Sequence, residues 1–432
     1  MFSKIQKYQP MENILYFSLL FFCLFLPFQF ALNPAPGFDL AIVRVFIPLL
    51  FAFWLFLRIK RKETLIINDR ITKLIIAFLF LSLISTIFSQ NYFWSLRKIL
   101  FLFSIAPIYL ISVSVFKDKN SFKLIAATLS IGATLLAIIG IIQFISQFIF
   151  GIDAVYAFLA KNITPFFIGN TFSKAVFAYP SWLVNSQGTT YMRAVAVFPD
   201  PHMLSYYFGL IIPWTIMLAI NSKNKFGWFF YSAVILITAD ILTFTRGGYI
   251  ALIAASITIL PLVNKYTAIK IVCASSLLLV LFLAVPHNPV SNRLTSSFDV
   301  EEGSNQARLS NWQQAILIIK ENPLGVGIGM YSLAVNPTAD YRQPIYAHNA
   351  YLDIAAELGI PAAILFIAIL LSAFSFFWKS ARKEPFFIAG VASITVFSIH
   401  SLVESPLYSV HILPLFFIIL AMASIAKKYE RV

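Results

Sequence analysis

Residues 123–149 read KLIAATLSIGATLLAIIGIIQFISQFI, and no charged residue follows Lys123 in this stretch. An α-helix needs about 20 mostly apolar residues to cross the hydrocarbon core of a bilayer. A helix that is apolar all round has no face to present to water. The stretch therefore predicts a transmembrane helix, and similar stretches recur on both sides of it.

The whole chain has the composition of a membrane protein. Of its 432 residues, 59% are hydrophobic and 12% are charged, whereas a soluble domain carries about 25% charged residues. Hydropathy predicts about twelve spans, with counts of eleven to thirteen left open. They lie at about 12–31, 39–58, 72–89, 96–116, 123–149, 203–220, 227–244, 247–263, 269–286, 350–378, 385–402 and 408–426. We expect an all-α membrane protein.

The basic residues predict how the spans are oriented. Lys and Arg gather in short loops on the cytoplasmic side of a membrane. With the N-terminus inside, 21 of the 32 basic residues fall in or beside predicted cytoplasmic segments, and Arg97 and Lys98 are the exception on the other side. Both termini are therefore expected in the cytoplasm. The charges form short clusters without an extended basic arm, so the net charge of +14 does not indicate nucleic-acid binding.

The predicted spans divide the chain into five parts. These are a five-span bundle at 1–149, an external loop at 150–202, spans six to nine at 203–286, a large external loop at 287–349 between spans nine and ten, and the last three spans with the tail at 350–432. Within the large loop, Leu309, Trp312, Ile316 and Ile319 recur at helical spacing before Asn322-Pro323, which predicts an amphipathic helix. We expect the first apolar run to be a retained helix, because no small-residue cleavage site follows it.

Two arginines begin the candidate site. Arg193 precedes Phe198-Pro199-Asp200-Pro201-His202, and Arg246 lies in the tight turn Thr245-Arg246-Gly247-Gly248. Each arginine either snorkels to the interface or faces an anionic ligand. Gly247 would let a ligand approach the backbone closely, and the arginine fork suits phosphate.

The other candidates flank the large loop. Arg308 begins the predicted amphipathic helix, and His348 stands at the external mouth of the tenth span beside Asn349, which can cap that helix. A lone histidine is more often structural, but its pKa suits it to accept a proton near neutrality. His400 and Glu404 form a weaker pair at the last external turn.

Several other kinds of site have little support. Cys23 and Cys273 lie in apolar runs, so a disulfide or a metal pair is not expected. His202, His348 and His400 can converge, but their spacing does not require it, and we predict no metal and no cofactor. The glycines of 322–329 lack the strand and the Lys-Ser/Thr of a nucleotide loop. Arginines and one histidine on one side of a bilayer suit transfer of a group from a phosphate-bearing lipid.

These motifs, in this order and on this side, resemble the O-antigen ligase and polymerase superfamily. The resemblance covers about 190–405 and rests most on His348-Asn349-x-Tyr351-Leu352-x4-Glu357-Leu358-Gly359. Pro361-Ala362-Ala363 and Pro201-His202 depart from the family pattern, which puts the subfamily in doubt.

The resemblance implies a metal-independent inverting glycosyltransferase of the bacterial inner membrane with a periplasmic active site. The donor would be an undecaprenyl-pyrophosphate-linked glycan, and the acceptor would be lipid A-core for a ligase or another lipid-linked repeat for a polymerase. Arg193 and Arg246, with Arg308 as a third, would hold the donor pyrophosphate, and His348 would be the base. Asn349, Tyr351, Glu357 and Gly247 would support the site.

Two other classes of function are kept as alternatives. A transporter of a small anion or of a lipid-linked sugar needs polar groups at the middle of the membrane, where Arg44 is a candidate. A structural membrane subunit would leave the external arginines and histidine unexplained. We expect membrane lipids as further partners of the chain.

Overall fold

The computed structural model describes residues 10–35, 38–65, 68–116, 118–178, 181–186, 188–224, 226–266, 269, 303–342 and 344–427. Nearly all of the ninth predicted span, Cys273 and His287 lie outside these residues. The described residues are mostly helical, at 74%.

Within the described residues the N-terminal half contains α1 (Pro10–Phe25), β1 (Ala31–Ala35), β2 (Phe38–Ala41), α2 (Val43–Lys60), α3 (Arg70–Ile84), α4 (Tyr92–Ile105), α5 (Pro107–Val115), α6 (Lys119–Phe150), α7 (Ile152–Phe158), α8 (Thr164–Ile168), α9 (Asn170–Ala178), β3 (Leu183–Ser186) and β4 (Thr189–Met192). The C-terminal half contains α10 (Pro201–Ile220), α11 (Trp228–Ile241), α12 (Arg246–Thr258), α15 (Gly303–Glu321), α16 (Tyr331–Val335), α17 (Ala350–Leu358), α18 (Ile360–Ala381), α19 (Ile388–His400) and α20 (Ile412–Ala426).

The apolar helices are those of a membrane protein. Among the described residues, five helical stretches are long and apolar enough to cross a membrane: Arg70–Phe88, Tyr92–Val115, Lys119–Phe150, Pro201–Ile220 and Ile360–Ala381. Five shorter apolar helices accompany them. A helix lies in each predicted span that the structure describes. The number of twelve spans stays a prediction.

Short polar side chains fix where many of these helices begin. The side chains of Asp69, Asn91, Asp118, Asp200 and Asn349 each accept a hydrogen bond from a backbone N–H of the first turn. The first N–H groups of a helix have no partner within the helix, so such a cap stabilises the start by about 1 kcal/mol. Two of these caps, Asp200 and Asn349, begin helices at the candidate site.

The first predicted span ends earlier than its apolar run. Helix α1 stops at Phe25, and the chain continues into an antiparallel hairpin of β1 and β2. Pro27 lacks the N–H that a continuing helix needs, which ends the helix although the following residues are still apolar. A second hairpin, β3 with β4, lies in the loop at 150–202. The all-α prediction therefore missed two short hairpins.

The tenth predicted span is broken in two. Helices α17 and α18 meet at Gly359, whose φ is +89°, so the prediction of one helix over 350–378 was wrong. A side chain there is excluded as well, because a Cβ on Gly359 would lie 2.6 Å from the carbonyl carbon of Leu324. The glycine-rich loop closes this break: the N–H groups of Val326 and Gly327 donate to the carbonyls of Ala356 and Glu357 at 2.9 Å each.

Segments that the charge pattern places in the cytoplasm lie together in the structure. Lys119 at the start of α6 forms an ion pair with Glu384, which precedes α19. Ser424 near the end of α20 bonds to Tyr109 at 2.7 Å and to Asp69 at the start of α3 at 3.1 Å. The predicted alternation of helix direction is consistent with these contacts.

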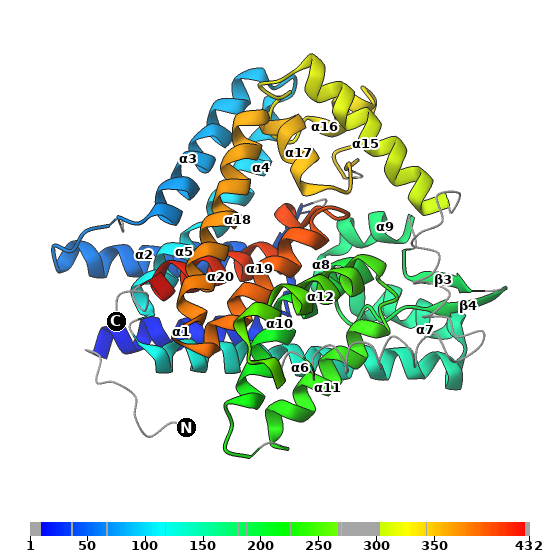
Figure 1. Ribbon diagram of the computed structural model, residues 1–432. Coiled ribbons are helices and arrows are strands. Elements are labelled where there is room, and N and C mark those ends of the chain that lie inside the picture. The colour runs from blue at the N-terminus through cyan, green and yellow to red at the C-terminus, as the bar shows by residue number, and fades with distance from the viewer. Residues whose placement is uncertain are drawn as a thin grey trace.

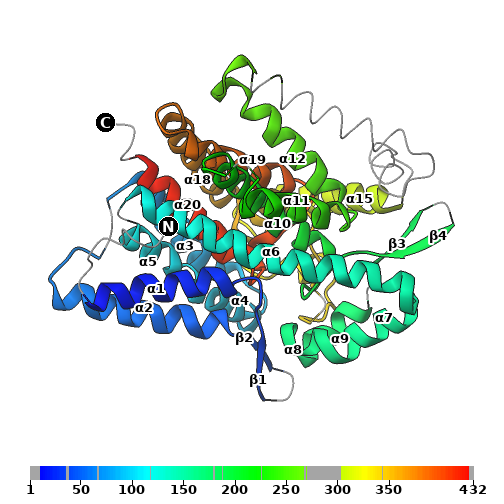
Figure 2. The ribbon, with the colours of Figure 1, turned by 90° about the horizontal axis from the view of Figure 1, so that it is seen from below.

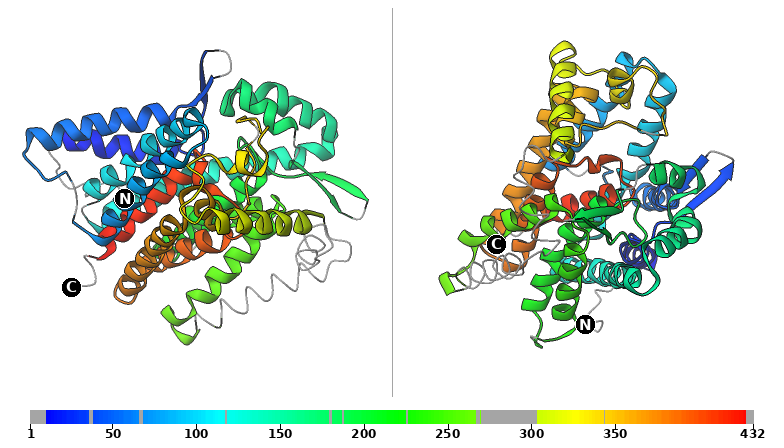
Figure 3. Two further views of the ribbon diagram at one scale, coloured as in Figure 1. Left: turned by 90° about the horizontal axis from the view of Figure 1, so that it is seen from above. Right: turned by 90° about the vertical axis from the view of Figure 1, so that its right-hand side faces the viewer.

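Figure 1 shows how this arrangement leaves one end for the long loops. Helices α3, α4 and α18 rise together toward α15, α16 and α17 at the top of the view. The long α6 runs beneath α10 and reaches the group of α7, α8 and α9, which Figure 2 shows from below. Figure 3 shows α15 in yellow-green, over the other helices in the view from above and at the upper end of the molecule in the side view. The helical prediction for 309–321 is therefore confirmed.

The face of α15 that packs matches the predicted one only in part, since Ile319 packs against the buried residues as predicted. Ala315 and Ile318 are buried in a cluster with Tyr331 and Ala347. Leu309 and Ile316 of the predicted apolar face are instead exposed. Helix α15 packs against α17, and this contact holds its N-terminal half, with Arg308, beside the His348 loop.

Candidate active site

Two glutamines of α6 hold the segment that carries Arg193. The Gln147 amide accepts from the Met192 N–H at 2.7 Å and donates to the Met192 carbonyl at 2.9 Å. Gln143 accepts from the Val195 N–H at 2.9 Å and donates to the Arg193 carbonyl at 3.1 Å. Both glutamines are buried. The end of β4 and the residues that follow it are thus fixed by side chains of a membrane helix.

The guanidinium of Arg193 is bound mainly by the protein itself. Arg193 is 3% exposed, and it donates to the carbonyls of Thr243 at 2.7 Å, Ser181 at 3.0 Å and Phe244 at 3.4 Å. It also donates to the Thr245 hydroxyl at 3.0 Å. These contacts clamp the turn between α11 and α12. The geometry therefore favours a positioning role for Arg193 over direct contact with a ligand.

The clamped turn leads directly into Arg246, the first residue of α12. Arg246 is 6% exposed, so its charge is held inside the protein. It lines a small recess together with His202, Phe244, Thr245, Gly247, Arg308, His400, Val403 and Glu404. Sequence analysis predicted Arg246, Gly247 and Arg308 as site residues, and the structure brings all three to this one recess.

Glu404 is the centre of the polar contacts around the recess. Its Oε1 lies 3.3 Å from Nδ1 of His202 and 3.3 Å from a terminal nitrogen of Arg308. Its Oε2 lies 3.4 Å from Nδ1 of His348. The side chain of Glu404 is 6% exposed. One buried carboxylate therefore joins groups from α10, α15 and the loop before α17.

His202 connects this carboxylate to Arg193. Its Nε2 lies 3.3 Å from a terminal nitrogen of Arg193, and guanidinium nitrogens only donate. Nε2 must therefore accept, which leaves Nδ1–H to donate to Glu404. His202 is neutral in this arrangement. Among the described residues, no group of three or more His, Cys, Asp and Glu side chains is arranged so that it could hold a metal ion.

His348 is presented from a fixed but strained piece of backbone. Its φ is +52°, a left-handed value that is uncommon outside glycine. Its neighbours are anchored: the Ala347 N–H donates to Asp353 at 2.8 Å, and the Ala350 N–H donates to the Ser401 carbonyl at 2.9 Å. The side chain of His348 itself is 46% exposed. Such strain clusters at functional sites.

The charges around Glu404 set the protonation of this pair. The hydrogen bond to Glu404 raises the pKa of His348 above its usual value and outweighs partial burial, which lowers it. Burial alone would raise the pKa of Glu404, but His202, His348 and Arg308 outweigh it and hold that pKa well below the usual range. Glu404 is therefore a carboxylate that accepts from His348 Nδ1–H. This tautomer leaves Nε2 of His348 as a basic nitrogen at the exposed end of the ring.

Of the predicted supporting residues, Gly247 lines the recess, whereas Asn349, Tyr351 and Glu357 hold the loop. Asn349 caps α17 by accepting from the N–H groups of Tyr351 and Leu352. The Tyr351 hydroxyl donates to the Ser398 carbonyl at 2.9 Å. Glu357 accepts from the hydroxyl of Tyr408 at 2.9 Å. The cap fixes the start of α17, and the contacts of Tyr351 and Glu357 tie this helix to neighbouring segments.

Lys98, an exception to the charge pattern, has a structural explanation. Its Nζ lies 3.4 Å from the ring centroid of Tyr408 and 3.3 Å from the hydroxyl of Tyr346. These rings stabilise the ammonium group and connect α4 to the loop that carries His348. The charge of Lys98 is thus used inside the protein and says little about orientation.

Some residues of the site give only a weak signal in the sequence. Glu404 and His400 were weighed as a weak pair, and His202 as a convergence that the spacing does not require. Gln143 and Gln147 were missed. The sequence signal for them is their polarity within a predicted transmembrane helix. Two glutamines one turn apart in a mostly apolar helix are costly to bury unless they bind other buried polar groups.

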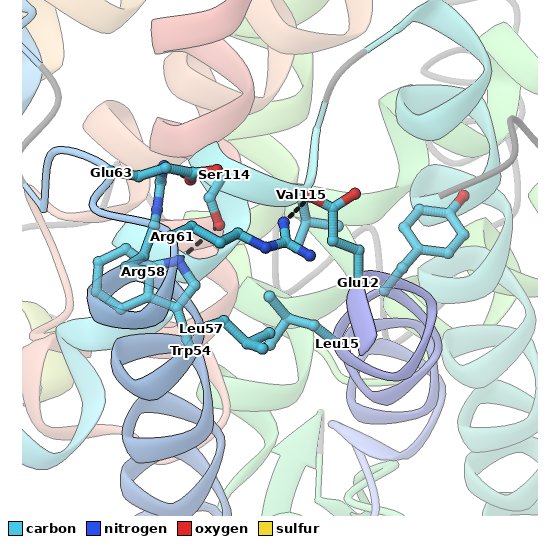
Figure 4. A pocket seen from close by; sticks show the side chains of 10 residues that line it. Glu12, Leu15, Trp54, Leu57, Arg58, Arg61, Glu63, Ser114 and Val115 are labelled. Atoms are coloured by element: carbon cyan, nitrogen blue, oxygen red, sulfur yellow. Dashed lines mark hydrogen bonds and ion pairs between the residues drawn. The ribbon is translucent and has the colours of Figure 1, made fainter. Parts of the chain in front are cut away.

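Another pocket lies away from this site, between α1 and α2, and is shown in Figure 4. Its Arg58 pairs with Glu63, and its Arg61 pairs with Glu12. The indole of Trp54 donates to Ser114 at 2.8 Å. Each arginine of this pocket thus faces a carboxylate. Arg44, the candidate for transport, packs over the Phe101 ring at 5.3 Å and bonds to Ser104 at 3.4 Å.

A comparison with protein families bears on this geometry. Residues 231–367 match the family model described as O-antigen ligase. This match covers less than half of the chain and supports membership of the O-antigen ligase and polymerase superfamily. The matched region includes Arg246, Arg308 and His348, whereas Arg193 and Glu404 lie outside it.

Members of this superfamily are membrane glycosyltransferase-like enzymes. No curated protein matches the chain. The match thus supports a membrane glycosyltransferase-like enzyme as the general class of the protein.

Proposed function

We propose that the chain is an O-antigen ligase that transfers a glycan with inversion from an undecaprenyl-pyrophosphate carrier to lipid A-core. The observation that carries the proposal is the cluster around Glu404. In this cluster the exposed His348, whose pKa is raised, contacts the buried Glu404 carboxylate. The cluster lies next to a recess lined by Arg246 and Arg308. A base beside buried cations is the arrangement that glycan transfer from a pyrophosphate requires.

The proposed reaction is a single displacement. Nε2 of His348 takes the proton from an acceptor hydroxyl, and the hydroxyl oxygen attacks the anomeric carbon of the glycan. The bond from that carbon to the pyrophosphate oxygen breaks, and its electron pair leaves with the carrier pyrophosphate. Attack from the side opposite the leaving group inverts the anomeric centre. Glu404 keeps the His348 tautomer and balances the charge that the ring gains.

The arginines take different parts in this scheme. Arg246 and Arg308 lie at the recess, where they balance the negative charge that develops on the leaving pyrophosphate. Arg193 is assigned the positioning of the turn before Arg246, because its guanidinium is bound by three carbonyls of the protein. The proposal routes no step through a metal or another cofactor.

The polymerase of the same superfamily is the alternative, because joining the glycan to another lipid-linked repeat needs the same base and the same cations. In both cases we place the chain in the bacterial inner membrane, with both termini in the cytoplasm and the recess on the periplasmic side. The charge clusters support this orientation.

The experiment that tests the proposal is a surface-glycan profile of a strain that lacks the gene. A ligase predicts loss of all long chains from lipid A-core while lipid-linked polymer accumulates. A core that bears a single repeat means a polymerase. An unchanged profile overturns the proposal for this glycan. Complementation with the intact gene restores the profile, and Arg246→Ala and His348→Ala genes are expected to fail at equal protein level.

A further inference from the structure

The first turn of α12 opens on the recess without a side-chain cap. Thr245 is the residue before the helix, but its hydroxyl does not bind the helix N–H groups. That hydroxyl accepts from Arg193 at 3.0 Å and donates to the Pro201 carbonyl at 3.2 Å. The Gly248 N–H already donates to the Thr245 carbonyl at 3.1 Å, so Gly247, which lines the recess, supplies the first-turn N–H that is available to a ligand. The start of a helix also carries a partial positive charge. The start of this 13-residue helix thus has the polarity of an anion site.

His400 is the independent observation that points to a ligand. Its side chain is fully buried, and within the described part of the chain neither ring nitrogen has a hydrogen-bond partner. The ring stacks on Tyr206 with centroids 4.4 Å apart, and the Tyr206 hydroxyl is fixed by the Phe397 carbonyl at 2.8 Å. A buried imidazole held in place with unpaired nitrogens is costly unless something binds to it.

The imidazole of His400 lies directly against the first turn of α12. A Cβ on Gly247 would come within 3.2 Å of Nε2 of His400 and within 2.7 Å of a methyl group of Val403. Only glycine leaves this approach open. His400, Arg246, Gly247 and Arg308 line the same recess.

We propose that this recess binds a phosphate group of the lipid-linked donor through the Gly247 N–H and the His400 imidazole. A neutral imidazole donates one N–H, which is enough for one phosphate oxygen. Arg246 and Arg308 supply positive charge, and Glu404 is engaged by His202, His348 and Arg308. The inference rests on the proposed function and deepens it, because it assigns His400 as a donor-binding residue.

The chain offers a matched control in His411. This residue is 2% exposed, its Nε2 has no hydrogen-bond partner in the described part of the chain, and its ring stacks on Phe198 at 4.0 Å. It does not line the recess. His400→Phe and His411→Phe therefore remove the same atoms and keep an aromatic ring for stacking. Only one of them changes the proposed phosphate site.

The experiment measures binding of geranyl pyrophosphate to the purified full-length protein in detergent by calorimetry. We expect His400→Phe to weaken binding about tenfold, as loss of one hydrogen bond to a charged group does, and His411→Phe to bind as the wild type does. His400→Gln restores a donor and is expected to recover part of the affinity, which also separates binding from a folding defect. Equal affinity of His400→Phe and wild type, or equal weakening by both phenylalanine variants, overturns the proposal.

Further arms separate the sources of phosphate and the two proposals. Inorganic pyrophosphate is expected to compete with geranyl pyrophosphate, whereas phosphatidylglycerol is not. If only phosphatidylglycerol competes, the recess binds bulk lipid headgroups and the donor site is overturned. Failure of the wild type to bind geranyl pyrophosphate also overturns it. If the chain transfers glycan but its donor affinity does not depend on His400, the phosphate site is overturned and the proposed function stands. Binding that depends on His400 without any glycan transfer upholds the site and removes the proposed function.

Discussion

At the scale of single residues, the proposed chemistry depends on the His348–Glu404 contact. The carboxylate is buried and ionised, and the histidine is half exposed. This division places the charge-balancing group inside and the proton-accepting nitrogen outside. It parallels the division of labour between the carboxylate and the imidazole in hydrolase triads.

Replacing His348 with alanine is expected to lower glycan transfer by about 10²–10⁴-fold, the usual contribution of a general base. Donor affinity should change little, because His348 does not line the recess. The measurement is the initial rate of transfer at saturating donor, with geranyl pyrophosphate binding as the control. A variant that keeps full transfer would remove His348 from the mechanism.

The pH dependence of transfer is expected to follow His348. A base acts when it is neutral, so the rate falls as pH drops through the pKa of His348, which Glu404 raises above 6.5. In Glu404→Gln the cause of the rise is gone, and the acidic limb of the profile moves to lower pH. The test compares initial rates of the two proteins from pH 5 to pH 9, in about half-unit steps. An acidic limb at the same pH in both proteins contradicts the assigned pair.

At the scale of elements, α6 does more than span the bilayer. It has 32 residues, a length of about 48 Å against about 30 Å of hydrocarbon. The surplus length brings Gln143 and Gln147 beneath the segment that carries Arg193. The helix thus anchors the site from below.

Gln143→Leu is expected to leave the Val195 N–H and the Arg193 carbonyl without their buried partner. Each unsatisfied backbone group costs about 1–3 kcal/mol, so the variant should unfold at a clearly lower temperature. Thermal unfolding of the purified protein measures this. The control is Ile142→Ala on the same helix, at a position that is 61% exposed. Equal stability of Gln143→Leu and the wild type would show that these contacts are not formed.

The break between α17 and α18 is expected to require glycine at 359. In Gly359→Ala the new Cβ meets the Leu324 backbone at 2.6 Å, and φ is +89°. The matched control is Gly188→Ala, with a φ of +83° and nothing within 4 Å of the Cβ. The control should cost about 1 kcal/mol from backbone strain alone, and Gly359→Ala substantially more. Similar unfolding temperatures for the two variants would contradict the close approach.

The sequence reveals these elements unevenly, for physical reasons. Apolar runs predict where helices lie, because burial in lipid demands them. The helix over 309–321 was predictable from periodicity. The tight turn between two apolar runs was predicted at 245–248, but Arg246, Gly247 and Gly248 lie in the first turn of α12. The break at Gly359 was not predictable, because it depends on a loop that closes from 30 residues earlier in the chain. The same holds for Glu404, whose partners come from three distant segments.

At the scale of the whole molecule, the proposed function requires the recess and the β3–β4 hairpin to lie outside the cytoplasm. Ser186→Cys in that hairpin is expected to react with a membrane-impermeant maleimide in cells with a permeabilised outer membrane. Lys62→Cys, in a predicted cytoplasmic loop, should react only after lysis. Both variants are made with Cys23 and Cys273 changed to serine. The reverse labelling pattern would contradict the orientation.

The central claim is glycan transfer by this chain with His348 as the base. The most direct measurement incubates the purified protein with an undecaprenyl-pyrophosphate-linked glycan and lipid A-core, without other proteins, and follows the joined product and its anomeric configuration. The account predicts an inverted product from the wild type and His411→Phe, and almost none from His348→Ala. A retained configuration, or equal product from His348→Ala and the wild type, would contradict it.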